Sequence, residues 1–161
     1  MPASCTFILN GQPISFLSCT GAGSVQAFSG MPEDRDKPES VAKPKSGPLP
    51  RGIYYIVDRQ TGGRLGWLYD FARANLYGTD RAKWFALYRA DGNIDDTTII
   101  NGVRRGAFRL HPNGPLGRSE GCITVKNPQD FERMSAFIRA QGATVPIPGT
   151  DINAYGIVEV R

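Results

Sequence analysis

The sequence contains a single histidine and three cysteines in 161 residues, and these low counts restrict the chemistry that the chain can carry. A Cys₃His zinc site would need Cys5, Cys19, Cys122 and His111 together. No two of these cysteines have the Cys-x₂₋₄-Cys spacing that is typical of zinc ligands. We therefore expect no bound metal and no cofactor.

Long apolar runs and long basic runs are missing as well. No stretch approaches the roughly 20 apolar residues of a membrane-spanning helix. The first residues lack a basic region and their apolar run breaks at Asn10, so we expect neither a membrane span nor a signal peptide. The net charge of +4 includes no basic run of five residues, and suits anionic cell-wall polymers or carboxylated peptides as well as nucleic acid.

The composition indicates one β-rich domain. At 161 residues, 40% of them hydrophobic, the chain is long enough for one sizeable core, so we expect a single domain over residues 1–161. Its 19 glycines and 12 prolines separate many short apolar runs, which favours a β-rich α+β fold over a helical bundle. Segment 31–50 differs because it is rich in proline and charge, and it is predicted to be a flexible loop.

Short alternating or β-branched runs mark the predicted strands, which cover residues 5–9, 14–19, 24–30, 53–57, 83–89, 97–101, 108–111, 123–125, 144–147 and 155–160. The first two form a hairpin in which Phe7 faces Leu17 and Cys5 faces Cys19, a register that pairs apolar side chains. Cys5 and Cys19 are therefore predicted to form a disulfide. Cys122 is the cysteine left free.

Two helices are predicted. The clearer one follows Asn127, which can cap it, and Pro128, which suits its first turn; Gly142 ends it. Its apolar face consists of Phe131, Met134, Phe137 and Ile138. A second helix over 66–76 is predicted from apolar residues near a 3.6 period, although glycines make its start uncertain.

The segment from Phe108 to Val125 holds His111 and Cys122 at the two ends of a loop rich in proline and glycine. Such a loop folds back, so the two side chains can lie side by side. An imidazole that takes the thiol proton leaves a thiolate–imidazolium pair, which attacks carbonyl carbons. The alternative is that Cys122 is a buried small hydrophobic residue and His111 an ordinary loop residue.

This segment resembles the signature of the L,D-transpeptidase (YkuD-type) catalytic domain, in which an upstream His is followed by Ser/Thr-His-Gly-Cys and a short apolar strand. Four residues match that pattern in order: Ser119, Gly121, Cys122 and Ile123. His111 takes the place of the upstream base. Glu120 stands where the family usually has a second His, and Thr124 where an Arg often follows.

The resemblance implies a fold and a reaction. The expected fold is an L,D-transpeptidase-like β-sandwich with one or two helices and a Pro/Gly-rich catalytic loop. The expected activity is that of an L,D-carboxypeptidase or L,D-transpeptidase, in which Cys122 is the nucleophile and His111 the base. Ser119 and Gly121 would shape an oxyanion hole with the Cys122 amide. Arg118 is the preferred ligand for a substrate carboxylate; the other basic candidates are Arg104, Arg105, Arg109 and Lys126.

The closest resemblance is to the L,D-transpeptidase effectors of type VI secretion systems. It implies peptidoglycan stem peptides as substrate, and the secretion machinery and a cognate immunity protein as partners. The chain would be secreted without a signal peptide and act in the periplasm of a target bacterium. We expect a monomer that does not bind nucleic acid.

Two other classes were weighed. Papain-like cysteine peptidases place Cys before His, whereas here the single His111 precedes Cys122, so that class is excluded unless another residue is the base. The non-enzymatic alternative is a β-rich binding module for anionic cell-wall polymer or nucleic acid. It predicts that Cys122 is buried and resists thiol reagents, and that binding weakens steeply with salt.

Overall fold

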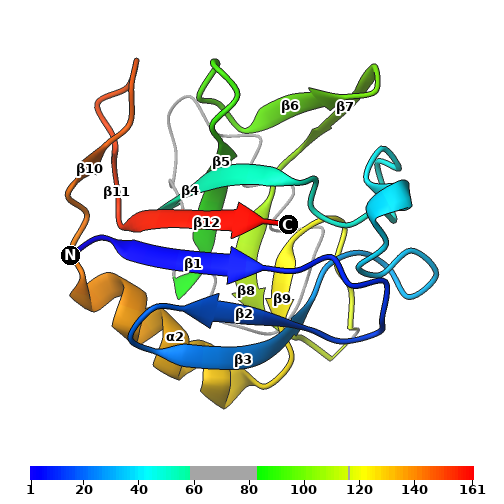
Figure 1. Cartoon of the computed structure of the whole chain (residues 1–161), viewed down its shortest axis with the longest axis horizontal. Coiled ribbons are helices and arrows are strands. Elements are labelled where there is room, and N and C mark those ends of the chain that lie inside the picture. The colour runs from blue at the N-terminus through cyan, green and yellow to red at the C-terminus, as the bar shows by residue number, and fades with distance from the viewer. Residues whose placement is uncertain (59–82, 116) are drawn as a thin grey trace.

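A computed structural model of the chain describes residues 1–58, 83–115 and 117–161. Within these ranges, eight strands form a closed barrel in the order β1-β12-β4-β5-β8-β9-β3-β2 (Figure 1). Their bounds are Ala3–Phe7 (β1), Ser15–Cys19 (β2), Gly23–Phe28 (β3), Gly52–Asp58 (β4), Phe85–Arg89 (β5), Arg109–Pro112 (β8), Ile123–Val125 (β9) and Gly156–Val160 (β12). The β-rich character with helix is confirmed.

The predicted β-sandwich is wrong, because one sheet closes on itself instead of two sheets packing face to face. Closure depends on two parallel pairs, β1 with β12 and β8 with β9, and on the antiparallel pair of β3 with β9. The first of these joins strands near opposite ends of the chain. Sequence alternation shows which face of a strand is buried, but it does not show which distant strand is the neighbour.

Two short hairpins lie outside the barrel. One consists of β6 (Thr97–Ile100) and β7 (Val103–Gly106), and the other of β10 (Val145–Pro146) and β11 (Asn153–Ala154) (Figure 1). The strand predicted at 144–147 is thus β10 and does not help to close the barrel. β7 and β11 were not predicted. Ile147 and Ala154 pack on the outer face of β4 and β5 in a small second core.

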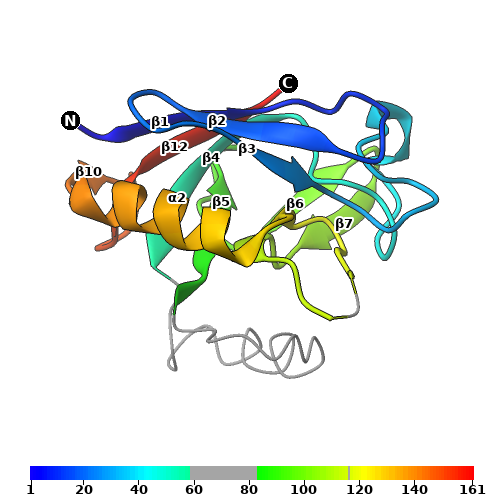
Figure 2. The same cartoon turned by 90° about the horizontal axis from the view of Figure 1, so that it is seen from below.

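The helix α2 (Pro128–Ala140) lies against the barrel near β2 and β3 (Figure 2). As predicted, the Asn127 side chain accepts a hydrogen bond from Gln129 N at 2.8 Å and caps the helix. Phe131, Met134 and Ile138 are buried in the main core, which the barrel strands share. The helix predicted over 66–76 falls outside the described residues.

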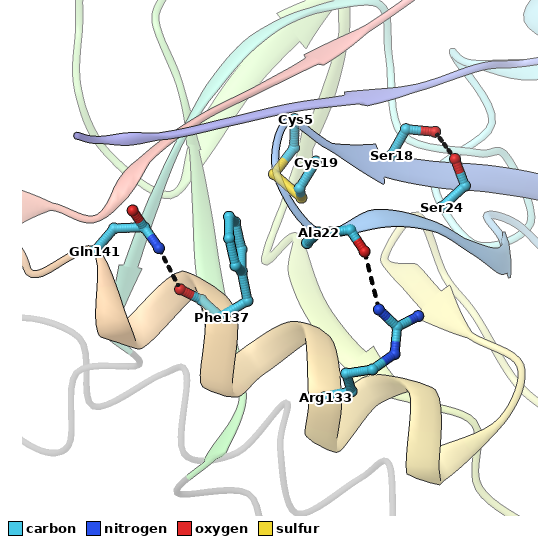
Figure 3. The surroundings of a disulfide bond; sticks show 8 residues. All are labelled: Cys5, Ser18, Cys19, Ala22, Ser24, Arg133, Phe137 and Gln141. Atoms are coloured by element: carbon cyan, nitrogen blue, oxygen red, sulfur yellow. Dashed lines mark hydrogen bonds between the residues drawn. A yellow bond between two sulfur atoms is a disulfide. The ribbon is translucent and has the colours of Figure 1, made fainter.

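The N-terminal hairpin has the predicted register, with Phe7 opposite Leu17 and Cys5 opposite Cys19. The Cys5–Cys19 disulfide is present (Figure 3). Phe137 of α2 points toward this hairpin in the same view. The disulfide therefore joins the two strands of this hairpin covalently.

Segment 31–50 contains no strand and a single 3-10 helix, η1 (Pro38–Ser40). Its turns are tied together by Asp34, whose carboxylate accepts hydrogen bonds from Ser40 (2.8 Å), Ser46 (2.6 Å) and Lys43 (2.7 Å). The Lys43 ammonium is the main reason that the pKa of Asp34 falls to about 2. The segment predicted as a flexible loop thus carries a buried polar cluster of its own.

Candidate active site

The parallel pairing of β8 with β9 relates the positions of the two predicted catalytic residues. His111 lies opposite Thr124 in this pair. Cys122 immediately precedes β9 and comes two residues before Thr124. In extended chains, two residues along and one strand across correspond to about 8 Å between α-carbons. The register therefore places the backbones of His111 and Cys122 near each other, while a direct contact between their side chains stays a prediction.

His111 is fully buried, at 0% exposure, and is held on three sides. Its Nδ1 lies 2.7 Å from the Pro112 carbonyl oxygen, which can only accept a hydrogen bond, so Nδ1 carries the proton. Nε2 lies 3.4 Å from Thr124 Oγ1. The Trp84 ring stacks on the imidazole at a centroid distance of 4.5 Å. The unprotonated nitrogen, Nε2, is thus the one placed to accept a proton.

Burial also decides the charge of the imidazole. It lowers the pKa of His111 to about 4; the Pro112 carbonyl acts in the opposite direction, and the Arg109 charge lowers the pKa further. At neutral pH the imidazole is therefore uncharged. An uncharged imidazole is the form that can act as a general base.

Cys122 is buried as well, with 3% of its surface exposed. Its thiol donates to the Ala107 carbonyl at 3.9 Å. Burial raises the pKa of the Cys122 thiol to about 12, although the charge and the backbone amide of Arg109 favour the thiolate. The resting pair is therefore a neutral thiol and a neutral imidazole. The sequence predicted a thiolate–imidazolium pair. The resting groups are neutral instead, because burial removes the hydration that would stabilise both charged forms.

A buried ion pair lies next to this site. Arg109 donates to both carboxylate oxygens of Asp96, at 3.0 and 2.6 Å, and both side chains are almost completely buried. Arg109 is a predicted candidate ligand for substrate carboxylates, but Asp96 occupies its guanidinium. Asp96 was missed because a carboxylate beside a predicted strand gives no local sign of a partner 13 residues away.

Arg105 was also predicted as a candidate ligand for substrate carboxylates, but its guanidinium is bound to backbone carbonyl groups of the protein itself. Its buried guanidinium donates to the carbonyl oxygens of Val41, Gly47 (3.1 Å) and Pro48 (3.1 Å), and it lies 3.5 Å from the Glu120 carbonyl. It therefore ties segment 31–50 to the loop that carries Cys122. Carbonyl ligands leave no trace in the sequence, so this role could not be predicted.

Gly121 occupies a position that no larger residue fits. Its φ of +104° lies in the region that L side chains rarely adopt. An added Cβ would collide with Arg105 Nη2 and lie 3.0 Å from Cε1 of Phe108. The backbone before Cys122 can pass this close to Arg105 only because residue 121 is glycine.

Ser119 is buried and braces the same loop. Its hydroxyl donates to the Cys122 carbonyl at 2.8 Å and accepts from the Gly30 amide at 3.1 Å. These bonds fix the backbone of the nucleophile candidate, while the part of Ser119 in an oxyanion hole stays a prediction. Arg118 is exposed.

An open cavity of about 380 Å³ lies beside the site. Its lining consists of Thr97, Arg104, Arg105, Gly106 and Ala107. Ala107, which accepts the hydrogen bond from Cys122, has a positive φ of 56° although it is not glycine. The cavity thus reaches the residue that the sulfur contacts.

The described residues include neither a cluster of metal ligands nor a membrane-spanning helix. In residues 1–58, 83–115 and 117–161, no three His, Cys, Asp or Glu side chains gather as a metal site would require. The disulfide between Cys5 and Cys19 also removes two ligands from the zinc site considered above. The same ranges hold no helix that is long and apolar enough to span a membrane.

A family model for the Tlde1 domain matches residues 23–150, which include both His111 and Cys122. The match assigns the chain to a class of proteins, the antibacterial effectors of type VI secretion. Because it covers well over half of the chain, the chain belongs to the Tlde1 domain family. This membership supports the secretion machinery and an immunity protein as partners. No curated protein and no solved structure matches the chain significantly.

Proposed function

We propose that the chain is a cysteine L,D-carboxypeptidase or L,D-transpeptidase that acts on the tetrapeptide stems of peptidoglycan. The observation that carries the proposal is the pairing of His111 on β8 with Thr124 on β9, a strand that begins directly after Cys122. The resemblance of this segment to the L,D-transpeptidase signature supports the substrate. Membership of an effector family supports an antibacterial role.

In the first half of the reaction, His111 Nε2 takes the proton of Cys122 while the sulfur attacks the carbonyl carbon of the third stem residue. The bond from this carbon to the nitrogen of the terminal D-amino acid then breaks. His111 returns the proton to the leaving amine, and the acyl group stays on sulfur as a thioester. Charge therefore develops only as the substrate reacts.

In the second half, an acceptor attacks the thioester and His111 takes the acceptor's proton. Water as acceptor releases a carboxylic acid and gives L,D-carboxypeptidase activity. An amine forms a new amide and gives transpeptidation or exchange. In both cases the proton returns to sulfur, so the enzyme regains its neutral thiol and imidazole.

Two arginines contribute positive charge near the thiol. Burial and the charges of Glu120 and Asp96 raise the pKa of the Cys122 thiol, whereas the Arg109 charge and backbone amide favour the thiolate. Fixed donors and charges in a dry site stabilise developing negative charge without having to reorganise. The buried guanidinium of Arg105, which is held by carbonyl oxygens and lies against Gly121, adds a second positive charge to the same loop.

Digestion of purified muropeptides, read by mass spectrometry, tests the proposal. The chain is expected to remove the terminal D-amino acid or exchange it, and Cys122→Ala and His111→Ala are each expected to abolish the reaction. Thermal unfolding of both variants checks that they remain folded. A Cys122→Ala protein that still cleaved tetrapeptide stems would overturn the assignment.

The proposed place of action is the periplasm of the target bacterium. The Cys5–Cys19 disulfide suits an oxidising compartment. Expression in a sensitive bacterium with an added periplasmic signal should cause swelling or lysis, and expression in the cytoplasm should not. The Cys122→Ala variant is the matched control. Toxicity from the cytoplasm alone would argue against a peptidoglycan target.

A second candidate is a non-enzymatic binding module for anionic polymer, which the burial of Cys122 favours. This function predicts that Cys122→Ala and the unaltered chain bind peptidoglycan equally and that neither changes the masses of the muropeptides. The digestion experiment separates the two candidates directly.

A further inference from the structure

The two faces of the β6–β7 hairpin differ in what they contact. Thr97 pairs with Gly106 and Ile99 with Arg104, so these four residues share one face. Three of them, Thr97, Arg104 and Gly106, line the cavity beside the site. The opposite face carries Arg105, which is buried against segment 31–50 and the catalytic loop. One face of the hairpin is therefore exposed at Ile99 and Arg104, whereas Arg105 of the other face contacts the protein interior and also lines the cavity.

The described residues that line this cavity carry positive charge. Arg104 and Arg105 are the charged residues among them, and these described lining residues include no Asp or Glu. Arg105 donates to backbone carbonyls in the interior, and Arg109 nearby is neutralised by Asp96. An anion that enters the cavity would thus meet a guanidinium that no carboxylate of the described lining neutralises.

Of the two arginines in this hairpin, Arg104 has the side chain that is accessible to a ligand. It is exposed, and among the residues that the structure describes its side chain has no hydrogen bond or ion pair. Directly across the hairpin, the apolar side chain of Ile99 is 63% exposed. Cation and apolar side chain together suit a ligand that carries a carboxylate next to hydrocarbon.

We propose that this face of the β6–β7 hairpin is a substrate subsite in which Arg104 binds a carboxylate of the stem peptide acylated at Cys122, with Ile99 contacting the neighbouring hydrocarbon. The proposal rests on the function proposed above. Arg104 precedes Ala107, the contact of the sulfur, by three residues, or about 10 Å of extended chain. A stem peptide in extended conformation spans the same distance with three residues.

Kinetics on paired substrates test the subsite. The substrates are a tetrapeptide with all carboxylates free and a set in which one carboxylate at a time is converted to a carboxamide. Arg104→Gln is expected to lower kcat/KM for the free peptide by about tenfold or more, because a charge-assisted hydrogen bond is lost. For one of the amidated peptides, Arg104→Gln and the unaltered enzyme should have the same kcat/KM.

The matched control is Arg133→Gln, which removes the same charge from α2, where the Arg133 side chain is half exposed. Figure 1 shows α2 and the β6–β7 hairpin on different sides of the molecule. Arg133→Gln should leave kcat/KM unchanged for every peptide. Equal losses in both variants, or a loss in Arg104→Gln that is the same for every peptide, would overturn the subsite.

Binding to an inactive protein separates failure of the subsite from failure of the proposed function. Calorimetry with Cys122→Ala and the free tetrapeptide should give a dissociation constant that rises about tenfold when Arg104→Gln is added. Binding that depends on Arg104 without any turnover by the unaltered chain would refute the enzyme and keep the subsite. Turnover that does not depend on Arg104 would refute the subsite and keep the enzyme.

Discussion

Burial determines the chemistry of the two central residues. Cys122 and His111 lie in a dry site, where neither charged form is hydrated. The thiol pKa rises to about 12 and the imidazole pKa falls to about 4, so both groups are neutral at rest and the pair does not hold a preformed ion pair. Burial of a neutral thiol also limits oxidation of the free cysteine.

The neutral resting state of the Cys122 thiol predicts how its reaction with iodoacetamide depends on pH. Because the thiol pKa is raised, the thiolate fraction is small at neutral pH and grows about tenfold per pH unit. The alkylation rate of the native protein should therefore keep rising above pH 9, whereas the unfolded protein should reach a plateau near the ordinary thiol pKa of about 8.5. Labelling reports on Cys122 alone, since Cys5 and Cys19 are bonded.

A preformed ion pair between Cys122 and His111 would give a different dependence of the alkylation rate on pH. A preformed thiolate–imidazolium pair would react at a constant rate between about pH 5 and pH 8, because the thiolate would already be present there. Such a plateau in the native protein, absent from His111→Ala, would contradict the neutral pair.

The loop that precedes Cys122 and the β6–β7 hairpin depend on each other. Arg105 of β7 is held by the carbonyl groups of segment 31–50 and reaches the loop at Glu120 and Gly121. Ser119 ties the same loop to Gly30 at the end of β3. Three separate parts of the chain therefore fix the backbone that precedes Cys122.

A comparison of two glycines in this loop tests the dependence. Both have positive φ, +58° at Gly117 and +104° at Gly121, but only Gly121 has neighbours within 4 Å. Gly117→Ala should lower the free energy of unfolding by about 1–2 kcal/mol through backbone strain alone. Gly121→Ala should cost about 1–3 kcal/mol more, because its Cβ also collides with Arg105.

Urea unfolding measures both changes, and the Gly121→Ala protein should also lose activity as Cys122 is displaced. Equal losses of stability in the two variants would show that Arg105 moves aside without cost. In that case the contact between β7 and the loop would not hold the site in place.

The whole molecule depends on closure of the barrel at its first strand. β1 lies between β12, at the end of the chain, and β2, to which the Cys5–Cys19 disulfide joins it. Arg133 of α2 donates to Ala22 O in the β2–β3 turn at 2.9 Å, so the helix holds the neighbouring hairpin (Figure 3). The strand that closes the barrel is thus fixed by hydrogen bonds on one side and also by a covalent bond on the other.

Reduction of this disulfide should destabilise the whole domain. The bond closes a loop with a sequence separation of 14, for which the chain-entropy model gives roughly 3 kcal/mol. Denaturant unfolding with and without dithiothreitol measures the loss. The double variant Cys5→Ala/Cys19→Ala should be insensitive to the reductant, while Cys122→Ala should respond as the unaltered chain does. An unchanged midpoint in reductant would contradict the expected stabilisation.

Local patterns in the sequence were sufficient for much of this protein. The helix cap at Asn127, the register that joins Cys5 to Cys19 and the strand at Ile123–Val125 were all predicted, because each depends on residues close together in the chain. The order of His111 and Cys122 around a folded-back loop was readable for the same reason.

Only the tertiary structure decided the rest. Closure of the barrel through β1 and β12, the pairing of Arg109 with Asp96 and the carbonyl cage around Arg105 each join segments that are distant in sequence. The neutral state of Cys122 and His111 likewise follows from their burial, which depends on what the whole fold packs around them. Residue types determine which chemistry is possible, but solvation and charge at a site are properties of the assembled molecule.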